Sequence, residues 1–265
     1  MMRLALTILI IALSGSLATA SQSPSKTYQD TRKLLSRMDD YDLYPERLAA
    51  LFRVGDARIN DLIQALDDPN KEISLHAQIV IRYLGNETGL KGLAEYYKKP
   101  REEYSWAGPI PIPIIEADYQ ILNDYINKPV ENLYLLKDAY IYALALDNSA
   151  RAKELLASIF AANGDLSANT FISRALISVK SNDPNKLLKG GKDLAKVVLE
   201  NAFFVGKFDK EYASSGLVGF NGAKDKAVVE VYINRGPLST EKYHVVISKH
   251  ENGWKFYSIT QTSIS

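Results

Sequence analysis

Residues 227–262 read AVVEVYINRGPLSTEKYHVVISKHENGWKFYSITQT, and this stretch decides the fold of the C-terminal part of the chain. Apolar and polar residues alternate in three runs, a period typical of β-strands with one buried face. Asn-Gly within the last turn is a strong hairpin signal. The expected strands are residues 227–233, 241–249 and 254–262, preceded by a Gly-rich strand around 212–220 and a helix at 192–205. These elements predict an α+β domain made of one helix and an antiparallel four-stranded meander.

The middle of the chain has helical spacing instead. Residues 62–85 read LIQALDDPNKEISLHAQIVIRYLG, with apolar residues three and four apart on both sides of an Asp-Pro turn. Pro, Asp and Asn favour the start of a helix, and Gly85 suits a left-handed C-terminal cap. The pattern predicts helices at 58–67 and 72–84, with a third opening at Thr88. The string resembles a HEAT repeat, and the resemblance implies an α-solenoid.

Three later segments also carry an apolar stripe at helical spacing, at residues 131–146, 150–162 and 171–180. Solenoid arrays usually need at least three repeats, and only one is clear here. The helical part is therefore interpreted as an irregular α-solenoid or a plain helical bundle. A tetratricopeptide-like arrangement of residues 138–180 is a further alternative.

A proline-rich break, YSWAGPIPIPII at residues 104–115, interrupts these helices. Prolines at alternate positions forbid a helix and favour extended backbone. One interpretation is a strap that buries its apolar side chains on the helical core. The other is a stiff, exposed recognition loop for a protein partner. Its candidate binding residues are Tyr104, Trp106, Ile110 and Ile112.

The last hairpin, YHVVISKHENGWKFYSIT, resembles the final hairpin of NTF2-like and cystatin-like α+β domains. This resemblance implies a sheet curved around a helix, a form that hosts ligand pockets, small enzymes and dimer interfaces alike. It also implies that Trp254 packs on the sheet against the 192–205 helix or a neighbouring strand. Strand alternation then places Phe256 and Ser258 on the side of Trp254 and Tyr257 on the other side.

Residues 1–20 are typical of an export signal. Arg3 precedes a ten-residue apolar run, and Ala18-Thr19-Ala20 fits the cleavage rule, so the mature chain is expected to start at Ser21. Ten apolar residues are too few to span a bilayer as a helix. The sequence thus predicts a multidomain periplasmic or extracellular protein: signal 1–20, helical domain 21–185 and α+β domain 186–265.

Composition excludes several classes of protein. The 265 residues are 46% hydrophobic and 24% charged, as in ordinary globular proteins. The net charge of +1 argues against a globally basic nucleic-acid binder. The chain has no Cys, which excludes disulfides, thiolate metal sites and a cysteine nucleophile. We expect no cofactor, no metal and no nucleic-acid partner.

Candidate chemistry is sparse, because the chain has three His. His76 lies on the second predicted helix without a second ligand nearby, so a structural role is expected. His244 shares a strand face with Lys242, and Glu230 shares one with Tyr232 on the neighbouring strand. A register that pairs the two faces would create a carboxylate–imidazole unit, the basis of acid–base catalysis. The simpler interpretation is a solvated outer face of the sheet.

Two classes of function follow. We favour an exported, non-catalytic protein that binds an unidentified protein partner through its helical surface. The alternative is a small-ligand-binding or weakly catalytic NTF2-like domain that uses Glu230, Tyr232 and His244.

Overall fold

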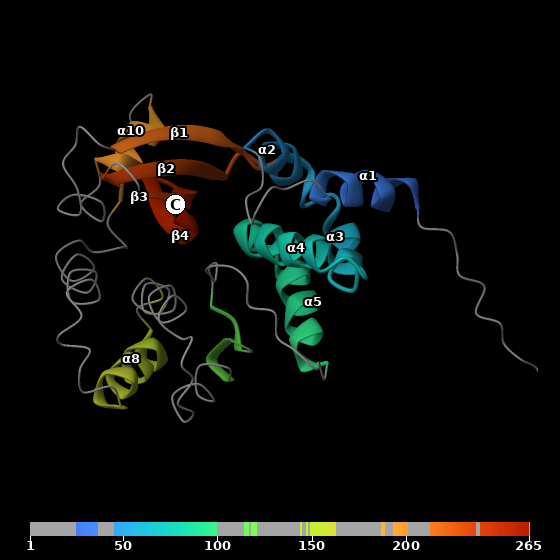
Figure 1. The fold of residues 1–265 in the computed structure, drawn as a ribbon, viewed down its shortest axis with the longest axis horizontal. Helices are drawn as coiled ribbons and strands as arrows, with labels where there is room; N and C mark the ends of the chain where they lie inside the picture. Colours follow the sequence, from blue (N-terminus) through green and yellow to red (C-terminus); the bar gives the residue numbers. More distant parts are fainter. Residues whose placement is uncertain are drawn as a thin grey trace, which may run out of the picture.

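The computed structural model describes residues 25–36, 45–99, 114–116, 118–120, 144, 147, 149–162, 187–188, 193–200, 213–236 and 239–264. Within them the chain is a mixed α plus β protein with a four-stranded antiparallel sheet (Figure 1). The expected signal at 1–20 and helices at 131–146 and 171–180 lie outside these residues, apart from position 144. The same holds for Tyr104, Trp106, Ile110 and Ile112 of the proline-rich segment.

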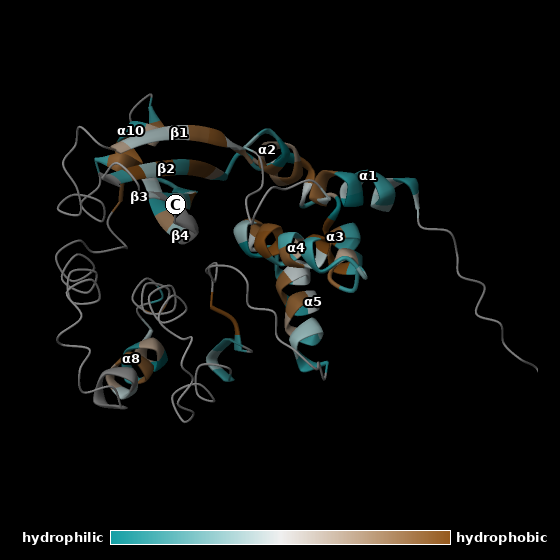
Figure 2. Cartoon of the chain, viewed as in Figure 1, coloured by the Kyte–Doolittle hydropathy of each residue, from teal (hydrophilic) through white to brown (hydrophobic). Residues whose placement is uncertain are grey.

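Five helices form the first part, which we call the helical body. They are α1 (Lys26–Leu35), α2 (Pro45–Val54), α3 (Ile59–Ala65), α4 (Lys71–Leu84) and α5 (Glu87–Lys98). Two further helices follow, α8 (Ala150–Ala162) and α10 (Leu194–Leu199). In Figure 2, α1 is mostly hydrophilic whereas α4 carries long hydrophobic segments, in keeping with the ten buried residues of α4. No helix in the described ranges is long and apolar enough to cross a membrane.

The turn from α3 to α4 confirms the predicted boundary signals. The Asn70 side chain caps α4 by accepting from the Glu72 amide at 2.9 Å. At the other end Gly85 adopts φ 60°, the left-handed conformation that favours glycine. Its N–H donates to the Ile81 carbonyl at 3.0 Å. The capping residues Asn70 and Gly85, which can be recognised in the sequence, therefore locate both ends of α4.

The sheet has the order β1-β2-β3-β4, a simple meander. Its strands are β1 (Ala213–Phe220), β2 (Lys226–Gly236), β3 (Ser239–His250) and β4 (Gly253–Ile264). All four expected strands are thus confirmed. Their pairing is antiparallel throughout, with a bulge in β4 between the Val246–Ser258 and Ile247–Phe256 pairs.

Both faces of the sheet are covered. One face, which we call the α10 face, packs apolar residues against Ala195 and Val198 of α10. The other, which we call the helical-body face, places Val228 and Val246 in the same core as α1–α5. Residues on the two sides of the expected boundary at 185/186 therefore share one hydrophobic core.

The C-terminal end of α4 is fixed on the sheet. The Lys226 ammonium donates to the Leu84 carbonyl and lies 4.4 Å from the centre of the Tyr257 ring. A cation at a helix C-terminus satisfies orphan carbonyls and complements the helix dipole. Tyr257 also packs against the helical-body core. This contact joins α4 to β2 and β4. Leu84 and Lys226 are 142 residues apart in the sequence.

Trp254 lies where the hairpin resemblance placed it. It is partly buried against the α10-face core, and its ring centre is 6.2 Å from that of Phe220. Its backbone also exchanges two hydrogen bonds with Leu188, at 2.7 and 3.1 Å. The expected side of Ser258 is wrong: the bulge pairs Ser258 with Val246, which turns it to the helical-body face.

Candidate functional site

The register of β2 and β3 brings the predicted polar residues together. Glu230 pairs directly with His244, and Tyr232 pairs with Lys242. Residues opposite each other in an antiparallel pair point to the same face. The carboxylate–imidazole unit that the sequence allowed is therefore formed, and Lys242 joins it.

Glu230 is the centre of this cluster, which we call the Glu230 network. Its Oε2 lies 2.8 Å from the Lys242 ammonium and 3.2 Å from Nε2 of His244. The Tyr232 hydroxyl donates to Oε1 at 2.6 Å. Burial alone would raise the pKa of Glu230, but hydrogen bonds from His244, Lys242 and Tyr232 outweigh it and lower the pKa to about 2. Glu230 is thus a carboxylate at any physiological pH.

The helical body supplies the other partner of His244. The Tyr83 hydroxyl of α4 lies 3.3 Å from Nδ1, and the two rings meet edge to face. A carboxylate only accepts, so the Nε2–H of His244 donates to Glu230. In the neutral imidazole, Nδ1 then accepts from Tyr83. His244 therefore links the sheet to α4.

The expectation of a solvated face is wrong. Glu230, Lys242 and His244 are 7%, 8% and 2% exposed. The reason is tertiary packing, because Tyr83 covers His244 and the neighbouring valines of this face lie within the helical-body core. Strand alternation distinguishes the two faces of a sheet but does not reveal which element covers each one.

The network uses its hydrogen-bonding capacity internally. Both oxygens of Glu230 and both ring nitrogens of His244 have protein partners. A general acid or base must instead be within hydrogen-bond reach of the substrate proton. The arrangement is that of a buried polar interface, in which each charge is held by its neighbours. Across the described part of the chain, no group of three His, Asp or Glu residues could hold a metal ion.

His76 has the structural role expected for it. The ring is 2% exposed, and its Nδ1 lies 2.8 Å from the Leu35 carbonyl at the end of α1. Burial lowers its pKa, more than the hydrogen bond to Leu35 raises it. His76 thus secures α1 on α4.

A second group of polar residues surrounds an open cleft of about 820 Å³ beside α1, which we call the α1 cleft. Its lining residues come from α1 and from the end of α3 and the turn before α4: Tyr28, Gln29, Arg32, Lys33, Ser36, Gln64, Asp67, Asp68 and Pro69.

Asp68 organises the α1 cleft. Its Oδ2 accepts from Arg32 Nε at 2.7 Å and from the Tyr28 hydroxyl at 2.8 Å. Its Oδ1 accepts from Arg32 Nη2 at 3.2 Å and from the Asn70 amide at 2.9 Å. Burial and the bond to Asp68 raise the pKa of Tyr28 to about 12, so the phenol stays protonated and keeps donating.

Sequence reasoning missed this cleft. Tyr28 and Arg32 lie four residues apart and thus on one side of a helix, which is a usable signal. In the sequence, Asp68 indicates only a turn. Nothing local predicts that it meets residues 36 to 40 positions earlier.

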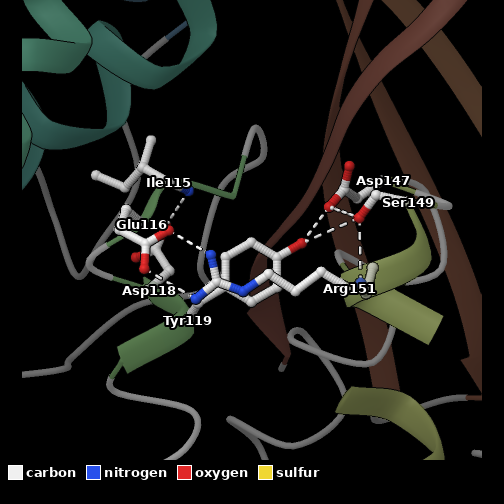
Figure 3. Close-up of polar contacts among 8 residues, drawn as sticks. Ile115, Glu116, Asp118, Tyr119, Asp147, Ser149 and Arg151 are labelled. Atoms are coloured by element: carbon white, nitrogen blue, oxygen red, sulfur yellow. Dashed lines mark hydrogen bonds and ion pairs between the residues drawn. The ribbon is translucent and has the colours of Figure 1, made fainter. Parts of the chain in front are cut away.

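A third cluster joins residues 115–120 to α8 (Figure 3). Arg151 of α8 pairs with Glu116, and its guanidinium lies 4.1 Å from the centre of the Tyr119 ring. The Tyr119 hydroxyl donates to Asp147, while Ser149 accepts from the Ala152 amide at 3.1 Å and caps α8. These contacts fix the start of a helix.

Residues 115–120 are also tied to the helical body. Arg82 of α4 and Asp118 form two hydrogen bonds of 2.7 Å, and both side chains are buried. The Ile115 amide donates to the same carboxylate at 2.9 Å. A buried bidentate pair of this kind fixes geometry, and it places this segment between α4 and α8.

Comparison with protein-family models found no match, and neither curated proteins nor solved structures gave one. The HEAT-like and NTF2-like resemblances therefore stay predictions.

Proposed function

We propose that this chain is an exported, non-catalytic protein-binding protein that uses its helical surface, arranged as an irregular α-solenoid. The observation that carries the proposal is the different state of its two polar clusters. The Glu230 network is buried and internally paired, whereas the α1 cleft is open and lies on a helix.

The buried state of the Glu230 network argues against catalysis there. A substrate would have to displace Tyr83 or one of the partners of Glu230 before it could reach His244. Removing one partner of a buried charge pair is costly, so such an opening is unfavourable. The network is better explained as the contact that holds the sheet on the helical body.

The α1 cleft has the features of a recognition surface. Its volume of about 820 Å³ is large enough for several side chains of a partner, and its lining combines Tyr28 and Pro69 with amides and charged groups. Interfaces favour Arg, which gives several hydrogen bonds, and the Arg32 side chain is 43% exposed. A partner polypeptide docked across α1 and the α3–α4 turn fits this lining.

Site-specific photo-crosslinking tests the proposal in cells that produce the chain. A photoreactive amino acid at Gln64, an exposed residue of the cleft, should give one discrete higher-mass product. The same residue at Lys153, on the exposed side of α8, is the control and should not give that product. Absence of any discrete product from Gln64 and the other cleft positions would reject a protein-binding role for this surface.

A further inference from the structure

We propose that the α1 cleft recognises a polypeptide segment rich in Asp and Glu, with Arg32 and Lys33 as the residues that bind its carboxylates. This inference rests on the proposed protein-binding function and adds the chemistry of the partner.

Arg32 is held ready for a second carboxylate. Asp68 takes its Nε–H and one Nη2–H, yet a guanidinium has five N–H donors. The other three make no hydrogen bond within the described residues, and the side chain is 43% exposed. A guanidinium already fixed by a buried acid loses little rotamer freedom on binding, which lowers the entropic cost.

The acidic groups of the cleft are already neutralised. Asp68 accepts four hydrogen bonds, which fills the usual capacity of a carboxylate. Asp67 pairs with the Lys99 ammonium at 2.5 Å. Neither acid therefore competes with an incoming carboxylate for the remaining donors of the cleft.

The lining of the cleft carries two cations and two acids, but Lys99, outside the lining, pairs with Asp67, so the charge of Lys33 is not offset there. The Lys33 side chain is exposed and its ammonium forms no ion pair within the part of the chain that the structure describes. Arg47 Nη1 donates to the Lys33 carbonyl at 3.4 Å, which brings another cation to the same end of α1. These cations also complement the C-terminal end of the α1 dipole. If these cations only stabilised the helix, removing them would leave peptide binding unchanged.

The other lining groups favour a polypeptide over a small anion. Gln29 and Gln64 carry amides, which both donate to and accept from peptide groups. Pro69 provides exposed apolar contact surface beside them, whereas Tyr28 is buried and only borders the cleft. A single carboxylate would engage one end of this cleft and leave most of its volume unused.

Fluorescence anisotropy with labelled peptides tests the proposal on the full mature chain. The probes are a ten-residue Gly-Glu repeat and two repeats of equal length in which Gln or Lys replaces Glu. The Gly-Glu repeat should bind tightest, and its affinity should fall as salt is raised. Equal binding of the Gln repeat, or no binding of the Gly-Glu repeat, would overturn the proposal.

Charge reversal locates the site. Lys33→Glu replaces an attraction with a repulsion and should weaken binding of the Gly-Glu repeat roughly three- to tenfold. Lys153→Glu makes the same change on α8 and should leave the affinity unchanged. Arg32→Lys keeps the charge but loses the fork geometry, so an intermediate loss is expected. Equal effects of the Lys33 and Lys153 variants would place binding elsewhere.

The crosslinking experiment separates the two proposals. A discrete product at Gln64 that Lys33→Glu and added salt leave unchanged would keep the binding function and reject the acidic partner. Absence of the product would reject the binding function itself.

Discussion

The two faces of the sheet are buried in different ways. The α10 face is closed by apolar packing between valines, isoleucines and the residues of α10. The helical-body face buries a carboxylate, an ammonium and an imidazole, and joins them to a tyrosine of α4. Apolar packing is tolerant of small rearrangements, whereas hydrogen-bonded charges allow one arrangement. We infer that apolar packing closes the first face and that the hydrogen-bonded charges of the second face set the position of the sheet on the helices.

Glu230→Ala should give the largest effect. It leaves the Lys242 and His244 side chains buried without their common acceptor, so the free energy of unfolding should fall by about 3–5 kcal/mol. Glu251→Ala removes an exposed carboxylate from the turn between β3 and β4 and should change the free energy of unfolding by less than about 0.5 kcal/mol. Urea unfolding measures both values. Similar small losses would mean that the network is not a structural unit.

Trp254→Ala tests the apolar face. The side chain is partly buried on Phe220, so truncation should cost about 2–3 kcal/mol, less than for a fully buried Trp. Leu217 is 45% exposed on β1, and Leu217→Ala should change the unfolding free energy by less than about 0.5 kcal/mol. If both substitutions cost the same, Trp254 does not contribute to the α10-face core.

Tyr83→Phe tests the link between helix and sheet with a smaller change. It keeps the ring on His244 but removes the hydroxyl near Nδ1, and one buried hydrogen bond contributes about 1 kcal/mol. Urea unfolding should show a loss of that size. An unchanged unfolding free energy would show that the Tyr83 hydroxyl does not stabilise the contact between α4 and the sheet.

Ser258→Ala should have the smallest effect and the opposite sign. The Ser258 hydroxyl is fully buried and makes no hydrogen bond to any residue that the structure describes. Removing an unsatisfied hydroxyl relieves its desolvation penalty, so stability should stay equal or rise by up to about 1 kcal/mol. A clear loss would indicate a partner for this hydroxyl.

Local patterns predict the elements of this fold well, because their causes are local. The α4 boundaries follow from Asn70 and Gly85, and the strands follow from a period of two between turn residues. Ser149 as the cap of α8 is similarly readable. The pairing of Glu230 with His244 could be anticipated as one possible register.

The contacts between elements that are distant in the sequence could not be predicted from local patterns. The bulge that turns Ser258 to the other face carries no clear sequence signal, since no Gly or Pro marks it. Burial of the Glu230 network depends on contacts with Tyr83, which is 161 residues away from His244. The α1 cleft depends on the ion pair between Arg32 of α1 and Asp68 in the turn after α3. Single-sequence patterns do not encode such distant pairings.

The pH dependence of stability tests the buried network most directly, by comparing the native chain with Glu230→Gln. The folded-state pKa of Glu230 is lowered from 4.5 to about 2, so its stabilising contribution is present above pH 4.5 and is lost as pH falls toward 2. This shift corresponds to up to about 3 kcal/mol. Unfolding free energies should therefore differ between the two proteins at pH 7 and converge as pH falls from about 4.5 to 2. A difference that stays constant over this range would contradict a buried, ionised Glu230 held by Lys242 and His244.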